Sequence, residues 1–185
     1  DGSLSDAEAQ KYLDDTGMST YADTHASSVY VARPSNGSKF TASDVEGFKK
    51  IVGKIVVSSN VKLVGIGNGA TFINENLSQY MNFVSGLALI NPEGITGKLS
   101  ASVPTYVSGN TNIAKAYIEA DHAAKINTDG SAATYQNPDS RFEIVVTDSS
   151  RKNAVDGYKA AWDTVLCKFG RIGNYIEGNG IGTWY

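Results

Sequence analysis

Apolar residues along the chain follow two spacings, one typical of strands and the other typical of helices. Short runs rich in Val, Ile, Leu, Phe and Tyr predict strands over residues 28–32, 60–66, 83–90, 103–107 and 142–146. Stretches with apolar residues at every third or fourth position predict helices over residues 6–14, 44–57, 70–79, 112–125 and 154–169. Alternation of this kind predicts an α/β fold, with a mostly parallel sheet of about five or more strands and helices on both faces.

Local signals mark the ends of several of these elements. Ser5 is an N-cap candidate for the first helix, and Glu8 stands at the position that completes a capping box. Asn36-Gly37 predicts a turn. Residues 127–140 are polar and rich in turn formers, so no regular element is predicted there.

The most informative stretch is the glycine-rich turn over residues 65–70, which follows a predicted strand and precedes a predicted helix. One kind of site with this order is the dinucleotide-binding turn, in which glycines let a pyrophosphate approach the N-terminus of a helix. Gly65, Gly67 and Ala70 match the looser G-x-G-x-x-A form, and Glu93 lies near the expected position of an acidic ribose ligand. The usual fingerprint lies in the first strand–helix unit, whereas this turn follows an internal strand.

The other kind of site is the nucleophile elbow, G-x-S-x-G, whose tight turn presents a serine above the sheet. Gly65, Asn68 and Gly69 fit this pattern, but Gly67 occupies the serine position. A glycine has no side chain with which to attack a carbonyl carbon.

Together with its flanking segments, this turn resembles part of a known family. The pieces that match in order are residues 29–34, 44–48, 68–70, 86–92, 103–109 and 161–171. They resemble the extracellular polyhydroxybutyrate-depolymerase and feruloyl-esterase-like group of α/β-hydrolases. The resemblance covers most of the chain. It implies one α/β-hydrolase-like domain over residues 1–185, or a fragment of a longer chain, and an extracellular or cell-surface location.

Carried over position by position, the resemblance implies that the catalytic groups are absent. Gly67 replaces the nucleophile, and Asn110 and Asn112 occupy the loop that carries the catalytic acid in the family. No histidine follows His122, although the family's general base lies near its C-terminus. The resemblance therefore implies a catalytically inactive domain with a binding or structural role. Two alternatives stay open: an esterase or depolymerase whose catalytic groups lie in a missing or partner segment, and a nucleotide-binding domain that uses the turn.

The resemblance also implies an incomplete sheet. In the family, a further strand lies between those that resemble residues 29–32 and 61–66, and this chain has no counterpart for it. An upstream segment, another chain or a second copy would then complete the sheet. Direct pairing of the two strands is the alternative.

Composition excludes or disfavours several classes of ligand and site. The chain has 185 residues, is 41% hydrophobic and carries a formal net charge of −3, which disfavours binding to nucleic acid. A single cysteine, Cys167, excludes an intrachain disulfide and a Cys/His zinc site. No apolar run has the length of a membrane span. No metal site and no cofactor are predicted.

Overall fold

The computed structural model describes residues 4–24, 28–56, 61–84, 86–94, 103–129, 132–140 and 142–147. The chain divides into two compact units, Asp1–Phe48 and Lys49–Tyr185. The expectation of one domain over residues 1–185 stays a prediction.

The first unit begins with two helices, α1 (Asp6–Asp15) and α2 (Met18–Thr24). The predicted capping box of α1 is confirmed. The Ser5 N–H donates to Glu8 Oε2 at 2.7 Å, and the Glu8 N–H donates to Ser5 Oγ at 3.3 Å. Each of these bonds satisfies a main-chain donor that the helix itself cannot pair, which explains why α1 begins where the sequence indicates.

The strand predicted over residues 28–32 is wrong, because residues 28–34 form neither a strand nor a helix. Tyr30 is 66% exposed and Val31 is 47% exposed. The preference of Val and Tyr for strands reflects packing on a pleated, half-buried surface, and these side chains have no such surface. An ion pair between Arg33 and Asp6, at 2.8 Å, joins this segment to α1.

A hydrogen-bonded clamp around Asp44 closes the loop that follows. The Ser35 N–H and Oγ donate to Asp44 Oδ1 at 2.8 and 2.5 Å, and the Thr41 N–H donates to Oδ2 at 2.8 Å. These bonds, led by that from the Ser35 hydroxyl, lower the pKa of Asp44 from 3.8 to about 2. The short 3-10 helix η1 (Ala42–Asp44) then leads into α3 (Val45–Val56), so the second predicted helix is confirmed.

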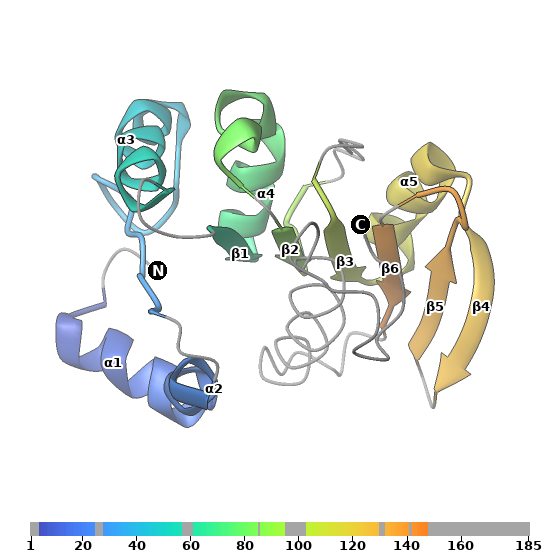
Figure 1. The fold of residues 1–185 in the computed structure, drawn as a ribbon, viewed down its shortest axis with the longest axis horizontal. Helices are drawn as coiled ribbons and strands as arrows, with labels where there is room; N and C mark the ends of the chain where they lie inside the picture. Colours follow the sequence, from blue (N-terminus) through green and yellow to red (C-terminus); the bar gives the residue numbers. More distant parts are fainter. Residues whose placement is uncertain are drawn as a thin grey trace, which may run out of the picture. The chain divides into compact units, whose positions relative to one another are not determined.

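The second unit contains a sheet with the strand order β1-β2-β3-β6-β5-β4 (Figure 1). The first four strands in this order pair in parallel, and their bounds are β1 (Lys62–Ile66), β2 (Gly86–Ile90), β3 (Thr105–Gly109) and β6 (Phe142–Val146). The antiparallel strands β5 (Ala132–Gln136) and β4 (Ala124–Asp129) extend it on the β6 side. The predicted α/β fold with a mostly parallel sheet is confirmed.

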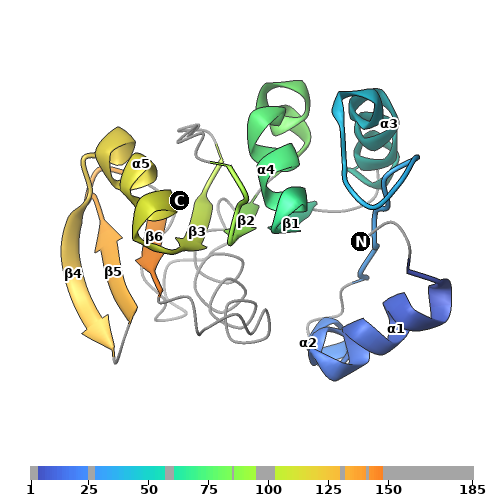
Figure 2. The same ribbon diagram turned by 180° about the vertical axis from the view of Figure 1, so that it is seen from behind.

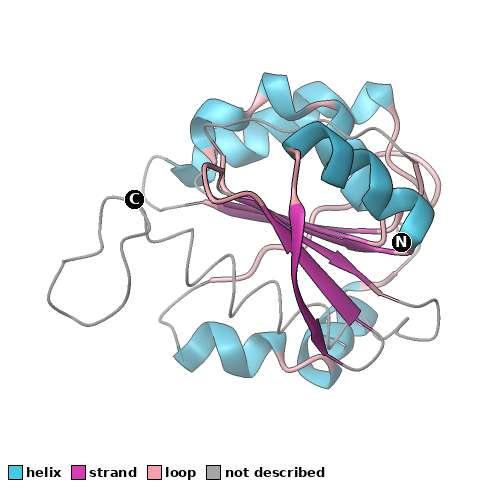
Figure 3. Cartoon of the chain, turned by 90° about the vertical axis from the view of Figure 1, so that its right-hand side faces the viewer, coloured by secondary structure: helices cyan, strands magenta, loops and turns pink. Residues whose placement is uncertain are grey.

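Helices α4 (Asn68–Glu75) and α5 (Thr111–Asp121) cover one face of this sheet (Figures 1 and 2). Helix α4 contacts β1 and β2, whereas α5 contacts β3, β6 and β5. Short 3-10 helices, η2 (Leu77–Gln79) and η3 (Met81–Phe83), connect α4 to β2. Figure 3 shows the twist of the strands. All residues of β2 and β3 are buried, as expected for central parallel strands. The helix predicted over residues 154–169 lies outside the described residues.

The β4–β5 hairpin corrects the expectation of an irregular stretch over residues 127–140. Residues 124–128 are exposed, and the pairing of β4 with β5 shifts register between Lys125 and Asn127. A solvated strand at the edge of a sheet needs few apolar residues, so its sequence lacks the usual strand pattern. The helix predicted over 112–125 ends early, at Asp121, because His122 adopts a left-handed conformation (φ 53°).

Hydrogen bonds join the C-terminal end of α5 to the turn between β5 and β6. Asn137 Nδ2 donates to the Asp121 carbonyl at 2.8 Å, and Ser140 Oγ donates to Asp121 Oδ2 at 3.1 Å. Asp121 is 6% exposed, and this burial raises the pKa of its carboxyl group.

Candidate functional site

The candidate site is the tight turn between β1 and α4, which the sequence singles out. One residue, Gly67, separates Ile66 at the end of β1 from Asn68 at the start of α4. Gly67 has φ 58° and ψ −124°, and its N–H donates to the Ile90 carbonyl at the end of β2 at 2.9 Å. Few L-residues adopt a positive φ without strain, so glycine suits this position.

The neighbouring glycines of the motif have different roles. A Cβ on Gly65 would lie 2.5 Å from Ala70 Cα and 2.7 Å from Ala70 N, so the absence of a side chain lets α4 approach β1. A Cβ on Gly69 would meet nothing within 4 Å. Gly65 is therefore required by packing, whereas Gly69 is not.

The segment after β2 brings a carboxylate to this turn. A Cβ built on Gly67 would lie 3.8 Å from Glu93 Oε1. Thr71 Oγ1, in α4, accepts hydrogen bonds from the Glu93 N–H at 2.8 Å and the Gly94 N–H at 3.2 Å. The acidic group therefore stands beside the N-terminus of α4, where the helix dipole favours a negative charge. The sequence suggests Glu93 only as a ribose ligand, and the spacing along the chain does not reveal this proximity.

The loop expected to carry a catalytic acid serves as a helix cap. Asn110 is the N-cap of α5, and its Oδ1 accepts hydrogen bonds from the Asn112 and Ile113 N–H groups at 3.0 and 3.1 Å. Asn112 is exposed in the first turn of α5. Neither amide carries a charge, and the oxygen of Asn110 is already engaged in capping.

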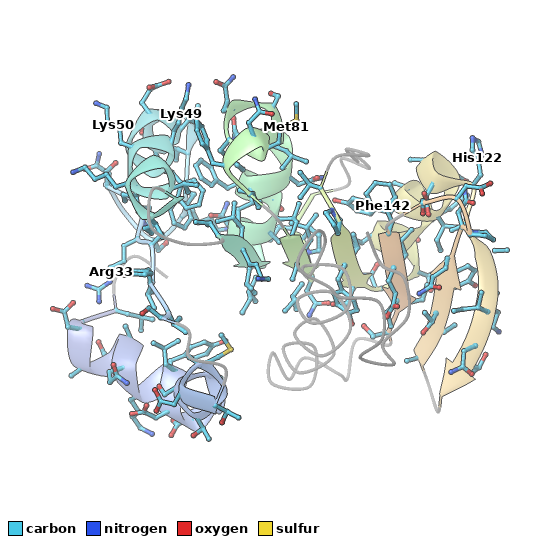
Figure 4. All side chains as sticks on the ribbon, viewed as in Figure 1. Arg33, Lys49, Lys50, Met81, His122 and Phe142 are labelled. Atoms are coloured by element: carbon cyan, nitrogen blue, oxygen red, sulfur yellow. The ribbon has the colours of Figure 1, made fainter. Side chains whose placement is uncertain are left out.

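The described histidine is not placed to act as a base at this loop. His122 is exposed at the C-terminal end of α5 and projects into solvent (Figure 4). The 11 residues of α5 separate Asn110 from His122, so at about 1.5 Å per residue the two residues lie about 18 Å apart along the axis. His25 and Cys167 lie outside the described residues.

Nowhere among the described residues do three or more His, Cys, Asp or Glu side chains gather closely enough to hold a metal ion. No described helix combines the length and hydropathy that a membrane crossing requires.

The fold and the turn define an α/β protein with a glycine at the apex of its strand–helix elbow. Comparison with known proteins adds no closer identification, since no family model, no curated protein and no solved structure matches the chain. The α/β-hydrolase resemblance therefore stays a prediction.

Proposed function

We propose that this protein is a catalytically inactive α/β-hydrolase-like domain with a binding or structural role. One observation supports this proposal most directly. The turn at Gly67 connects a strand to a helix through a single residue with positive φ, as in a nucleophile elbow, yet the residue at the apex has no side chain. Nucleophilic acyl transfer requires a hydroxyl or thiol at that position.

The residues at the other expected catalytic positions, and Glu93 beside Gly67, agree with this interpretation. Asn110 caps α5 with its side-chain oxygen, and His122 lies at the other end of that helix. Among the described residues, Glu93 brings a carboxyl group close to the apex, and the helix dipole at the N-terminus of α4 favours a negative charge there. A carboxylate in this place repels the oxyanion that ester hydrolysis creates.

The first alternative is an esterase or depolymerase whose nucleophile, acid and base come from a missing or partner segment. This alternative requires that the other segment place its nucleophile next to Gly67 and therefore close to the carboxylate of Glu93. The extracellular or cell-surface location expected from the resemblance applies equally to this alternative and stays a prediction.

The second alternative, a nucleotide-binding domain, has less support. The Gly67 N–H already donates to the Ile90 carbonyl and cannot also donate to a phosphate. The carboxylate of Glu93 stands where a pyrophosphate would approach α4, and two anions at one helix terminus repel each other.

For the structural role, we propose that a strand from an upstream segment or another chain adds to the outer side of β1. Among the described strands β1 ends the order, and its pairing with β2 shows no bulge. The opposite edge strand, β4, shifts register against β5 and carries exposed polar residues, which are features that discourage strand addition. Light scattering after size exclusion tests this idea, since a monomer that remains stable and unaggregated at high concentration would contradict it.

The main proposal is tested by activity-based labelling. The purified chain should not react with a serine-directed fluorophosphonate and should not hydrolyse short-chain aryl esters above the buffer rate. Gly67→Ser should restore little hydrolysis, because it supplies neither an acid nor a base. Stoichiometric labelling of a serine in the wild-type chain would refute the proposal.

A further inference from the structure

We propose that Asn36-Gly37 is a site of spontaneous deamidation, at which the main-chain nitrogen of Gly37 converts Asn36 to aspartate and isoaspartate. This inference is independent of the proposed function. Residues 35–39 are all exposed and form a bend, and Gly37 has φ 68° with nothing within 4 Å of an added Cβ. Among the described residues, no hydrogen bond holds the Asn36 carboxamide or the Gly37 N–H.

The chemistry needs only water. The Gly37 nitrogen loses its proton to solvent and attacks Asn36 Cγ, so that a bond forms between these atoms. The bond from Cγ to Nδ2 breaks, and the nitrogen leaves as ammonia after taking a proton from water. Water then opens the cyclic imide at either carbonyl, which gives aspartate or isoaspartate. Glycine favours this reaction because it has no Cβ to hinder the attacking nitrogen and its main chain rotates freely.

The chain supplies a matched internal comparison at Asn68-Gly69. This pair has the same two residues but lies in the first turn of α4, where the helix fixes the main-chain dihedral angles. Close packing of α4 on β1 at Gly65 opposes the rotation that cyclisation requires. The third pair, Asn179-Gly180, lies outside the described residues.

The reaction would act directly on the clamp around Asp44. Ser35, which donates two hydrogen bonds to Asp44, immediately precedes Asn36. Deamidation adds one negative charge next to this carboxylate, and the isoaspartate product also lengthens the main chain inside the loop that the clamp closes. Both changes weaken the hydrogen bonds that Ser35 and Thr41 donate to the Asp44 carboxylate.

The test is incubation of the full chain at mildly alkaline pH, followed by peptide mass mapping and enzymatic methylation of isoaspartate. In the folded protein, Asn36 should convert several-fold faster than Asn68. In denaturant the two sites should convert at similar rates, because the dipeptide is the same and the helix is gone. Gly37→Ala should slow conversion at Asn36 several-fold and leave Asn68 unchanged.

Two results would overturn the proposal. One is conversion at Asn68 that equals or exceeds that at Asn36 in the folded chain. The other is an Asn36 that stays intact while the same site converts in the denatured chain. The comparison between folded and denatured protein uses only the wild-type sequence, so it stands even where Gly37→Ala alters the loop.

Discussion

Replacement of Gly65 by alanine should destabilise the protein far more than the same change at Gly69. A Cβ on Gly65 would lie 2.5 Å from Ala70 Cα, 2.7 Å from Ala70 N and 2.8 Å from Gly69 O. All three atoms belong to the main chain, so no side-chain rotation relieves the overlap. Helix α4 must move away from β1, and its buried residues Phe72 and Ile73 must move with it.

The size of the effect follows from this geometry. Overpacking a buried site costs about 1–3 kcal/mol, and a rigid main-chain overlap belongs at the upper end, near 3 kcal/mol. For a domain of this size, each kcal/mol shifts the melting temperature by about 2–4 °C, so Gly65→Ala should lower it by about 6–12 °C. Gly69 lies in a helix with open space around it, and Gly69→Ala should stabilise the protein by up to about 1 kcal/mol.

Urea unfolding followed by circular dichroism measures both variants under the same conditions. The difference in unfolding free energy between Gly65→Ala and Gly69→Ala should reach about 3–4 kcal/mol. A Gly65→Ala variant as stable as wild type would refute the packing of α4 against β1 described above. A destabilised Gly69→Ala variant would instead refute the placement of Gly69 in a regular, open helical turn.

Three further predictions concern charge and ligands. Asp44→Asn should lower the unfolding free energy at pH 7 by about 1–2 kcal/mol. The lowered pKa of Asp44 means that its stabilisation is present above 3.8 and is lost as the pH falls toward 2, so the variant and wild type should unfold alike near pH 2. Asp121→Asn should have the opposite effect on the pH dependence of the unfolding free energy. The raised pKa of Asp121 makes its ionisation unfavourable in the folded state, and stability is therefore lost as the pH rises through that pKa. The variant should gain stability over wild type as the pH rises above 3.8 in urea titrations, and an unchanged difference would contradict the burial of this carboxyl group. Millimolar NAD should leave the melting temperature unchanged, since a ligand that binds only the native state would raise it. A saturable increase abolished by Gly67→Val would favour the nucleotide-binding alternative.

Elements with strong local signals could be predicted from the sequence. The capping box at Ser5 and Glu8 fixes the start of α1 through bonds within one turn, so no distant contact is needed. The apolar runs that become β2 and β3 are fully buried, and β6 is buried at all but its last residue, as their composition indicates. In β1, buried residues alternate with partly buried ones.

Elements that depend on pairing with another segment were predicted less well. Residues 28–32 have the composition of a strand but form no strand in the structure. By contrast, the sequence of β4 does not indicate a strand, yet β4 pairs with β5. Strand formation is decided by the neighbour as much as by the segment. The proximity of Glu93 to Gly67 depends on how the segment after β2 folds back onto Thr71, and no pattern within either segment encodes it.

The strand order has a consequence for the kinetics of folding. Strands β4, β5 and β6 each pair with their neighbour in sequence, so this meander forms through short loops. The pairing of β3 with β6 aligns Thr105 with Phe142, and α5, β4 and β5 lie between these two strands in the sequence. Among the described strand pairs, β3 with β6 closes the longest stretch of chain, so its formation costs the most loop-closure entropy. This pairing proceeds faster once β4, β5 and β6 are already paired with one another. Weakening the β4–β5 hairpin should therefore slow refolding more than it accelerates unfolding, which stopped-flow measurements of both rates would reveal.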